Sequence, residues 1–67
     1  MKVCTATARK SFSIPKADEA PDSVYTKGKE YRCVLRDDCS AVIQDDAAGT
    51  TSMHVLDAKK HFNIKEN

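Results

Sequence analysis

The chain has 67 residues and a formal net charge of +1, from 11 basic and 10 acidic side chains. A chain this short forms one small domain with a modest core, here residues 1–67, and has little room for the deep concave pocket that most small-molecule sites require. This size argues against an enzyme and for a protein that acts by binding.

The charges are unevenly spread along the chain. Residues 1–36 carry eight basic and four acidic side chains, a net of +4, and residues 37–57 carry five Asp and no Lys or Arg, a net of −5. Residues 58–67 carry three Lys and one Glu, a net of +2. Such asymmetry can mark an interaction surface, although Asp-rich turns and Lys-rich strand faces are also ordinary solvated surface.

Neither the N-terminal residues nor the cysteines indicate secretion, and no apolar run indicates a membrane span. The first residues are too polar for a secretion signal, and no apolar run approaches the roughly 20 residues of a membrane span. The three cysteines are odd in number and lack paired spacing, which argues against a disulfide framework. We expect a soluble, intracellular protein.

The first third of the chain predicts two short strands and a loop. Residues 2–8 alternate, with Val3, Thr5 and Thr7 on one face, and the Thr content favours a strand. Residues 11–14 alternate again before Pro15, which removes a ladder donor. Residues 16–23 are polar and acidic and predict an exposed loop, which could be a passive connector or a contact loop.

The middle of the chain predicts a β-meander. Gly28 lies at the centre of a turn that requires a positive φ. Residues 29–36 then alternate in the pattern of a half-buried antiparallel strand. The acidic pair at 37–38 makes a tight connection to the next strand at 41–44.

The last third predicts a turn, a strand and one short helix. Residues 45–49 form the turn, with Gly49 in the left-handed region, and residues 51–56 form the strand. Asp57 is the expected N-cap of a helix over residues 58–62, whose last turn carries Lys59, Lys60 and His61, where cations are favoured.

These elements add up to an all-β domain of four to six short strands with a C-terminal helical turn. Such a sheet avoids exposed edges by curling into a barrel, and Phe62 and Ile64 are expected to fold back and plug it. The expected core consists of Val3, Phe12, Ile14, Val24, Tyr25, Tyr31, Leu35, Val42, Ile43, Met53, Val55, Leu56, Phe62 and Ile64.

The order of turns and strands resembles the small SH3-like barrel proteins encoded by bacteriophages and prophages. The residues that carry the resemblance are Val24, Tyr25, Gly28, Lys29, Tyr31, Val42, Ile43, Asp45, Asp46, Gly49 and Phe62. They span about two-thirds of the chain and are mainly turn and barrel-closure signals. The resemblance implies an SH3-like barrel of about five antiparallel strands and an accessory protein in the cytoplasm of a bacterial host. It carries no catalytic residue.

The residues that could bind metal or catalyse a reaction lack the required spacing. Cys33 and Cys39 are six residues apart, and His54 and His61 are seven apart, unlike the close pairs of structural zinc sites. The Asp pairs lack the ligand alternation of a calcium loop and fit turns instead. We predict no catalytic residue, no metal and no cofactor.

The best candidate for a binding surface is a set of basic residues around one strand. Arg32 and Arg36 share a strand face, Lys27 and Lys29 flank the turn that leads into it, and Tyr25 is near in sequence. Such a patch could hold phosphates and stack a base, or it could be a solvated strand face. With only four Tyr and Phe rings in the chain, the capacity for stacking is poor.

The sequence therefore favours a protein-interaction module that acts on a host protein, as a monomer or a weak homodimer. A nucleic-acid-binding barrel that uses the same basic residues is the alternative, with steep salt dependence as its signature.

Overall fold

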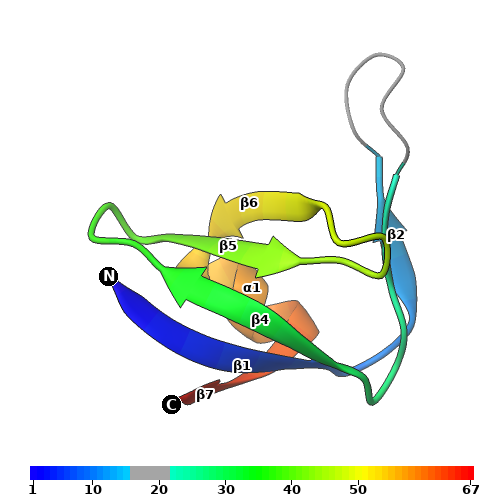
Figure 1. The fold of residues 1–67 in the computed structure, drawn as a ribbon, viewed down its shortest axis with the longest axis horizontal. Coiled ribbons are helices and arrows are strands. Elements are labelled where there is room, and N and C mark those ends of the chain that lie inside the picture. The colour runs from blue at the N-terminus through cyan, green and yellow to red at the C-terminus, as the bar shows by residue number, and fades with distance from the viewer. Residues whose placement is uncertain (16–21) are drawn as a thin grey trace.

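The computed structural model describes residues 1–15 and 22–67, which form seven strands and one helix. The elements are β1 (Lys2–Ala8), β2 (Phe12–Ile14), β3 (Ser23–Tyr25), β4 (Glu30–Leu35), β5 (Ser40–Gln44), β6 (Thr50–His54), α1 (Val55–His61) and β7 (Phe62–Glu66). Five strands form an antiparallel sheet in the order β6-β5-β4-β1-β7, and β2 pairs with β3 in a hairpin at one end of it (Figure 1). The expected all-β class with a short C-terminal helix is confirmed.

Strand β1 lies between β4 and β7 and shows which face of the sheet is buried. It pairs with β4 on one side, where Cys4 lies opposite Cys33, and with β7 on the other. Cys4, Ala6 and Ala8 are buried, whereas Val3 is 45% exposed. The alternation of β1 was predicted, but the assignment of Val3 to the core was wrong. The core lies on the face with small side chains because aromatic rings from other elements fill the space there.

Four aromatic rings form the centre of the core. Tyr25 contacts Tyr31 and Phe62 edge to face, with ring centroids 4.9 and 5.0 Å apart, and stacks on Phe12 at 5.1 Å. Edge-to-face and offset pairs are the favoured geometries of aromatic rings. The rings pack with Cys4, Ala6, Ala8, Cys33, Ala41, Ile43 and Ala58.

Two other expected core residues lie at the surface. Val24 is 47% exposed and Leu56 is 62% exposed. Val42 and Val55 are only half-buried. For Val24 and Val42, which lie in strands, the reason is the same as for Val3. A strand buries one of its two faces, and the residues next to these valines in sequence are on the buried face.

The two predicted turns differ in where the left-handed residue falls. Gly28 has a φ of +80°, as predicted. In the second turn Ala48, rather than Gly49, has a positive φ, of 63°. The Asp45 carboxylate accepts hydrogen bonds from the backbone N–H groups of Ala47 and Gly49, both at 2.9 Å, and these bonds hold Ala48 in the left-handed conformation.

Helix α1 begins earlier than predicted, so the strand expected to reach residue 56 ends at His54. The N-cap is His54, whose Nδ1 accepts a hydrogen bond from the backbone N–H of Leu56 at 3.1 Å. Asp57, the predicted cap, lies in the first turn, where a negative charge is also favourable. The basic last turn is present as predicted.

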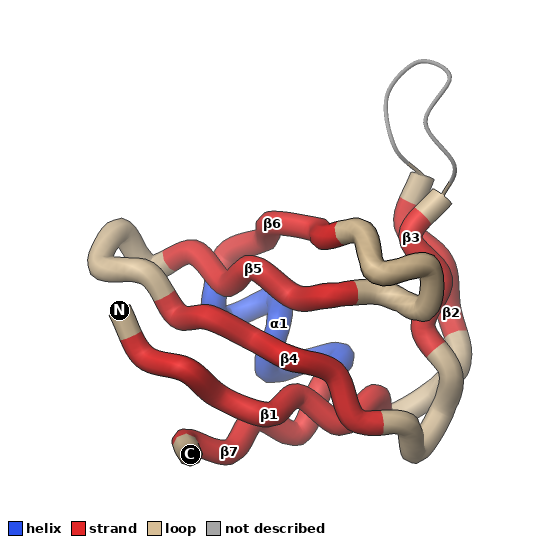
Figure 2. Tube along the Cα trace, viewed as in Figure 1, coloured by secondary structure: helices blue, strands red, loops and turns tan. Residues whose placement is uncertain are grey.

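The C-terminal residues form a strand that was not predicted. Phe62 is fully buried, as expected, but residues 62–66 pair with β1 as β7. Within the described ranges no ladder joins the edge strands β6 and β7, and α1 connects these strands and contacts both. Figure 2 shows α1 lying along one side of the curved sheet.

The predicted loop at residues 16–23 is only partly described. Residues 16–21 lie outside the described residues. Ser23 is not loop: it begins β3 and is buried.

Candidate functional site

Tyr25 cannot serve as the surface ring that was expected beside the basic residues. Its side chain is 1% exposed, and its hydroxyl donates a hydrogen bond to the backbone carbonyl of Ile43 at 3.0 Å. Burial raises the pKa of this hydroxyl. The prediction that Tyr25 stacks a ligand was wrong because Tyr25 stacks inside the protein instead.

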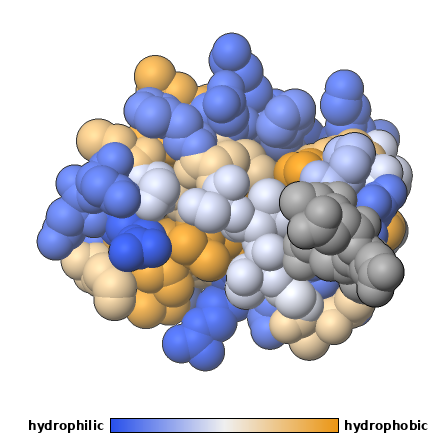
Figure 3. All heavy atoms as spheres, turned by 90° about the horizontal axis from the view of Figure 1, so that it is seen from above, coloured by the Kyte–Doolittle hydropathy of each residue, from blue (hydrophilic) through white to orange (hydrophobic). Residues whose placement is uncertain are grey.

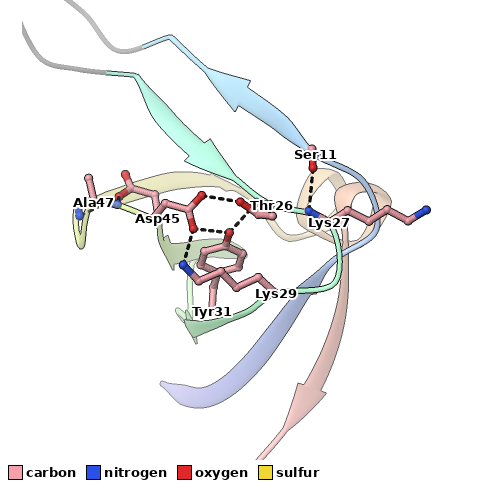
Figure 4. A network of polar contacts seen from close by, with 9 residues as sticks. Ser11, Thr26, Lys27, Lys29, Tyr31, Asp45 and Ala47 are labelled. Carbon is pink, nitrogen blue, oxygen red and sulfur yellow. Dashed lines mark hydrogen bonds and ion pairs between the residues drawn. The ribbon is translucent and has the colours of Figure 1, made fainter.

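Lys29 is held by an acidic partner. Its Nζ lies 2.8 Å from Oδ1 of Asp46 and 5.6 Å from the centroid of the Tyr31 ring. Asp46 also accepts hydrogen bonds from the Tyr31 hydroxyl at 2.7 Å and the Thr26 hydroxyl at 2.9 Å (Figure 4). The bonds from Lys29, Tyr31 and Thr26 lower the pKa of Asp46 to about 2. Lys29 therefore joins two turns and is not a free cation.

The other basic candidates lie far apart. Lys27 and Lys29 flank the turn before β4, and Arg36 follows the other end of that strand. At about 3.3 Å per residue, the seven steps from Lys29 to Arg36 span roughly 23 Å. The structure therefore does not bring Lys27, Arg32 and Arg36 into one compact patch.

Arg32 instead faces outward in a row that crosses three strands. Thr5 on β1 lies opposite Arg32 on β4 and opposite Lys65 on β7. Arg32 and Lys65 are exposed, and neither has an acidic side chain within ion-pair distance among the described residues. Sequence reasoning missed Thr5 and Lys65 because it did not predict β7, which places Lys65 beside β1.

An apolar row runs beside this polar row on the same outer face. Val3 lies opposite Val34, and Val34 lies opposite Val42, so three valines on β1, β4 and β5 are direct neighbours. All three are exposed or half-buried. Figure 3, which looks down on the molecule from the side of β6, shows apolar and hydrophilic side chains mixed on that side of the molecule. We call the residues Val3, Thr5, Arg32, Val34, Val42 and Lys65 the outer face.

An open hollow of about 460 Å³ lies at this face. Its lining is Val3, Cys4, Thr5, Glu30, Tyr31, Arg32 and Asn67. The Thr5 hydroxyl donates a hydrogen bond to Oδ1 of Asn67 at 3.0 Å. The hollow thus brings a carboxylate, a guanidinium and an apolar wall together at the surface.

Two of the three cysteines are buried and the third is exposed. Cys4 and Cys33 lie opposite each other in the core, and burial, with a smaller effect of Cys4, raises the pKa of Cys33 to about 11. Cys39 is exposed. No three His, Cys, Asp or Glu side chains in ranges 1–15 and 22–67 are grouped as metal ligands.

Comparisons with known proteins returned no relative. No protein-family model matches this chain, and no curated protein and no solved structure matches it. The one described helix is too short to cross a membrane.

Proposed function

We propose that this chain is a small accessory binding protein, encoded by a phage or prophage, that docks on a protein of its bacterial host through the outer face. The observation that carries the proposal is the in-register row of three solvent-facing valines. A small all-β domain with a short C-terminal helix is compatible with the resemblance to phage SH3-like proteins. A cytoplasmic location follows from the same proposal.

The chemistry of the outer face specifies the partner. Cross-strand neighbours have Cβ atoms about 5 Å apart, so Val3, Val34 and Val42 form an apolar strip about 10 Å wide. Arg32 and Lys65 lie on either side of Thr5, next to this strip, without acidic partners in the described part of the chain. The complementary surface is an apolar patch bordered by carboxylates, which would pair with these cations and exclude water from the valines.

The outer face fits a protein better than a nucleic acid. Single-stranded nucleic acids bind where aromatic rings accompany the cations. The outer face as defined above has no ring, and Tyr25, the ring expected to accompany Arg32, is buried. The apolar strip, in contrast, has no role in holding phosphates.

A matched pair of valine substitutions tests the proposal. Val3 and Val24 are both strand valines, 45% and 47% exposed, but only Val3 belongs to the outer face. Immobilised wild-type, Val3→Glu and Val24→Glu proteins are incubated with nuclease-treated bacterial lysate, and retained proteins are identified by mass spectrometry. We expect at least one host protein to bind wild type and Val24→Glu but not Val3→Glu.

A second variant links the partner to the charges. Arg32→Glu should weaken capture of the same host protein and make the remaining binding less sensitive to salt, because it removes an attraction to carboxylates. Equal retention by all variants, with their folding confirmed by circular dichroism, would refute docking through the outer face.

A further inference from the structure

Three segments distant in sequence meet at the end of the sheet where β1 ends. The backbone N–H of Arg9 donates to the carbonyl of His61 at 2.9 Å, which joins the bend after β1 to the end of α1. The N–H of Gly28 donates to the carbonyl of Ala8 at 2.9 Å, and the N–H of Lys27 donates to Oγ of Ser11 at 2.9 Å. The bend at 9–10, the turn at 26–29 and the last turn of α1 are therefore neighbours.

Each of these segments carries exposed cations. They are Arg9 and Lys10 in the bend, Lys27 in the turn, and Lys59 and Lys60 in the last turn of α1. None of the five has an ion-pair partner within residues 1–15 and 22–67. Figure 4 shows the Lys27 side chain pointing away from Lys29 and Tyr31, two of the residues whose side chains bind Asp46. We call this end the basic end.

The two ends of the sheet differ in their exposed charges. The turn between β4 and β5, with Asp37 and Asp38, lies at the opposite end of the sheet from the turn at 26–29 (Figure 1). The turn with Asp45 and Asp46 also lies beside the turn at 26–29, where Asp46 pairs with Lys29. The net charge of only +1 therefore conceals five cations at the basic end that have no ion-pair partner among the described residues. A polyanion that approaches such a protein is steered to its basic end.

The basic end also has a ring pair that reaches the surface. The rings of Phe12 and His61 are 5.0 Å apart at an interplanar angle of 32°, and both residues are only half-buried. Phe12 is fixed from beneath by Tyr25 and Phe62, with centroids 5.1 and 5.5 Å away. Two rings held in place next to unpaired cations are what a stacked base with flanking phosphates requires.

From this geometry we infer that the basic end is a second binding site, which takes single-stranded nucleic acid: Phe12 and His61 stack on a base, and Arg9, Lys10 and Lys27 contact the adjacent phosphates. The site is separate from the outer face and differs from the one expected from the sequence, since it excludes Arg32 and Arg36. The recognition is independent of sequence because every base has a face to stack and every nucleotide has a phosphate.

Two triple variants with equal net charge test the site. One reverses three cations of the basic end (R9E/K10E/K27E), and the other reverses three cations elsewhere (R32E/R36E/K65E). Each takes the net charge from +1 to −5, a change of 3 × −2. Binding is measured by fluorescence anisotropy with labelled oligo-dT and oligo-U of about 12 nucleotides and with a duplex of equal length, over a series of salt concentrations.

We expect the basic-end variant to lose about tenfold or more in affinity and the other triple variant to change by less than about threefold. For the wild-type protein, three phosphate contacts on a single strand predict a slope of log affinity against log salt near about −2. His61→Ala should weaken binding about fivefold without changing the salt slope, because it removes stacking and no phosphate contact. If the basic-end variant does not fold by circular dichroism, R9Q/K10Q/K27Q is compared with R32Q/R36Q/K65Q instead. Equal losses in the two triple variants, duplex binding as tight as single-strand binding, or no binding at low salt would each overturn the inference.

Discussion

The hydrogen bonds of Tyr31 make a quantitative prediction possible. Its hydroxyl donates to Asp46 at 2.7 Å and accepts from the backbone N–H of Thr26 at 2.7 Å, while its ring lies in the core with only 5% of the residue exposed. Tyr31→Phe keeps the ring and removes both bonds. A bond to a charged acceptor contributes about 1.5–3 kcal/mol, and water can reach the freed Thr26 N–H because Thr26 is exposed. We expect the free energy of unfolding to fall by about 2 kcal/mol.

Urea and thermal unfolding at neutral pH, followed by circular dichroism, measure this loss. For a domain of this size, about 2 kcal/mol lowers Tm by roughly 10 °C. The control is the same substitution in an Asp46→Asn background, where the charged acceptor is already gone and Tyr31→Phe should cost clearly less. A loss below about 0.5 kcal/mol, or an equal loss in both backgrounds, would show that the Tyr31–Asp46 bond does not join the two turns as described.

Three further predictions concern the turns, acid stability and the thiols. Ala48→Gly should raise Tm by a few degrees, because a left-handed φ strains Ala by about 1 kcal/mol and Gly removes this strain. The greater conformational freedom of Gly in the unfolded state offsets only part of this gain. An unchanged or lower Tm would contradict the prediction. The pKa of Asp46 is lowered from 3.8 to about 2. The Asp46 carboxylate therefore stabilises the fold fully above pH 3.8, and this stabilisation is lost as the pH falls toward about 2. Urea midpoints of Asp46→Asn should therefore fall less steeply with acid than those of wild type. A thiol reagent should label one cysteine, Cys39, in the native protein and also Cys4 and Cys33 after denaturation, as mass spectrometry would show; rapid native labelling of Cys33 would contradict its burial.

The strands could be predicted from the sequence, but the buried face could not. Alternation in β1 and β4 fixes which residues share a side, because successive side chains point to opposite faces. Alternation does not show which side of the strand faces the core. Hydrophobicity favoured the side of β1 that carries Val3 over the side that carries Cys4, Ala6 and Ala8. That face is inward because the rings of Tyr25, Tyr31 and Phe62 occupy the interior and leave room only for small neighbours.

The candidate site was less predictable because it depends on contacts between distant segments. Lys29 was recognised as basic, but its partner Asp46 lies 17 residues away and is brought near by the pairing of β4 with β5. Arg9 and His61 are 52 residues apart and meet only because β7 returns along β1. The start of α1 at Val55 was missed for a local reason: a histidine, rather than Asp57, caps it.

The core of small side chains around aromatic rings also has a spectroscopic consequence. The methyl groups of Ala6, Ala8, Ala41 and Ala58 are buried in the cluster that contains the rings of Tyr25, Tyr31 and Phe62. Circulating π electrons shift nearby protons strongly, and only when rings and methyls hold fixed positions. The native state should therefore have alanine methyl resonances displaced from their random-coil values in a proton NMR spectrum. Their collapse to ordinary values would report loss of the packed core.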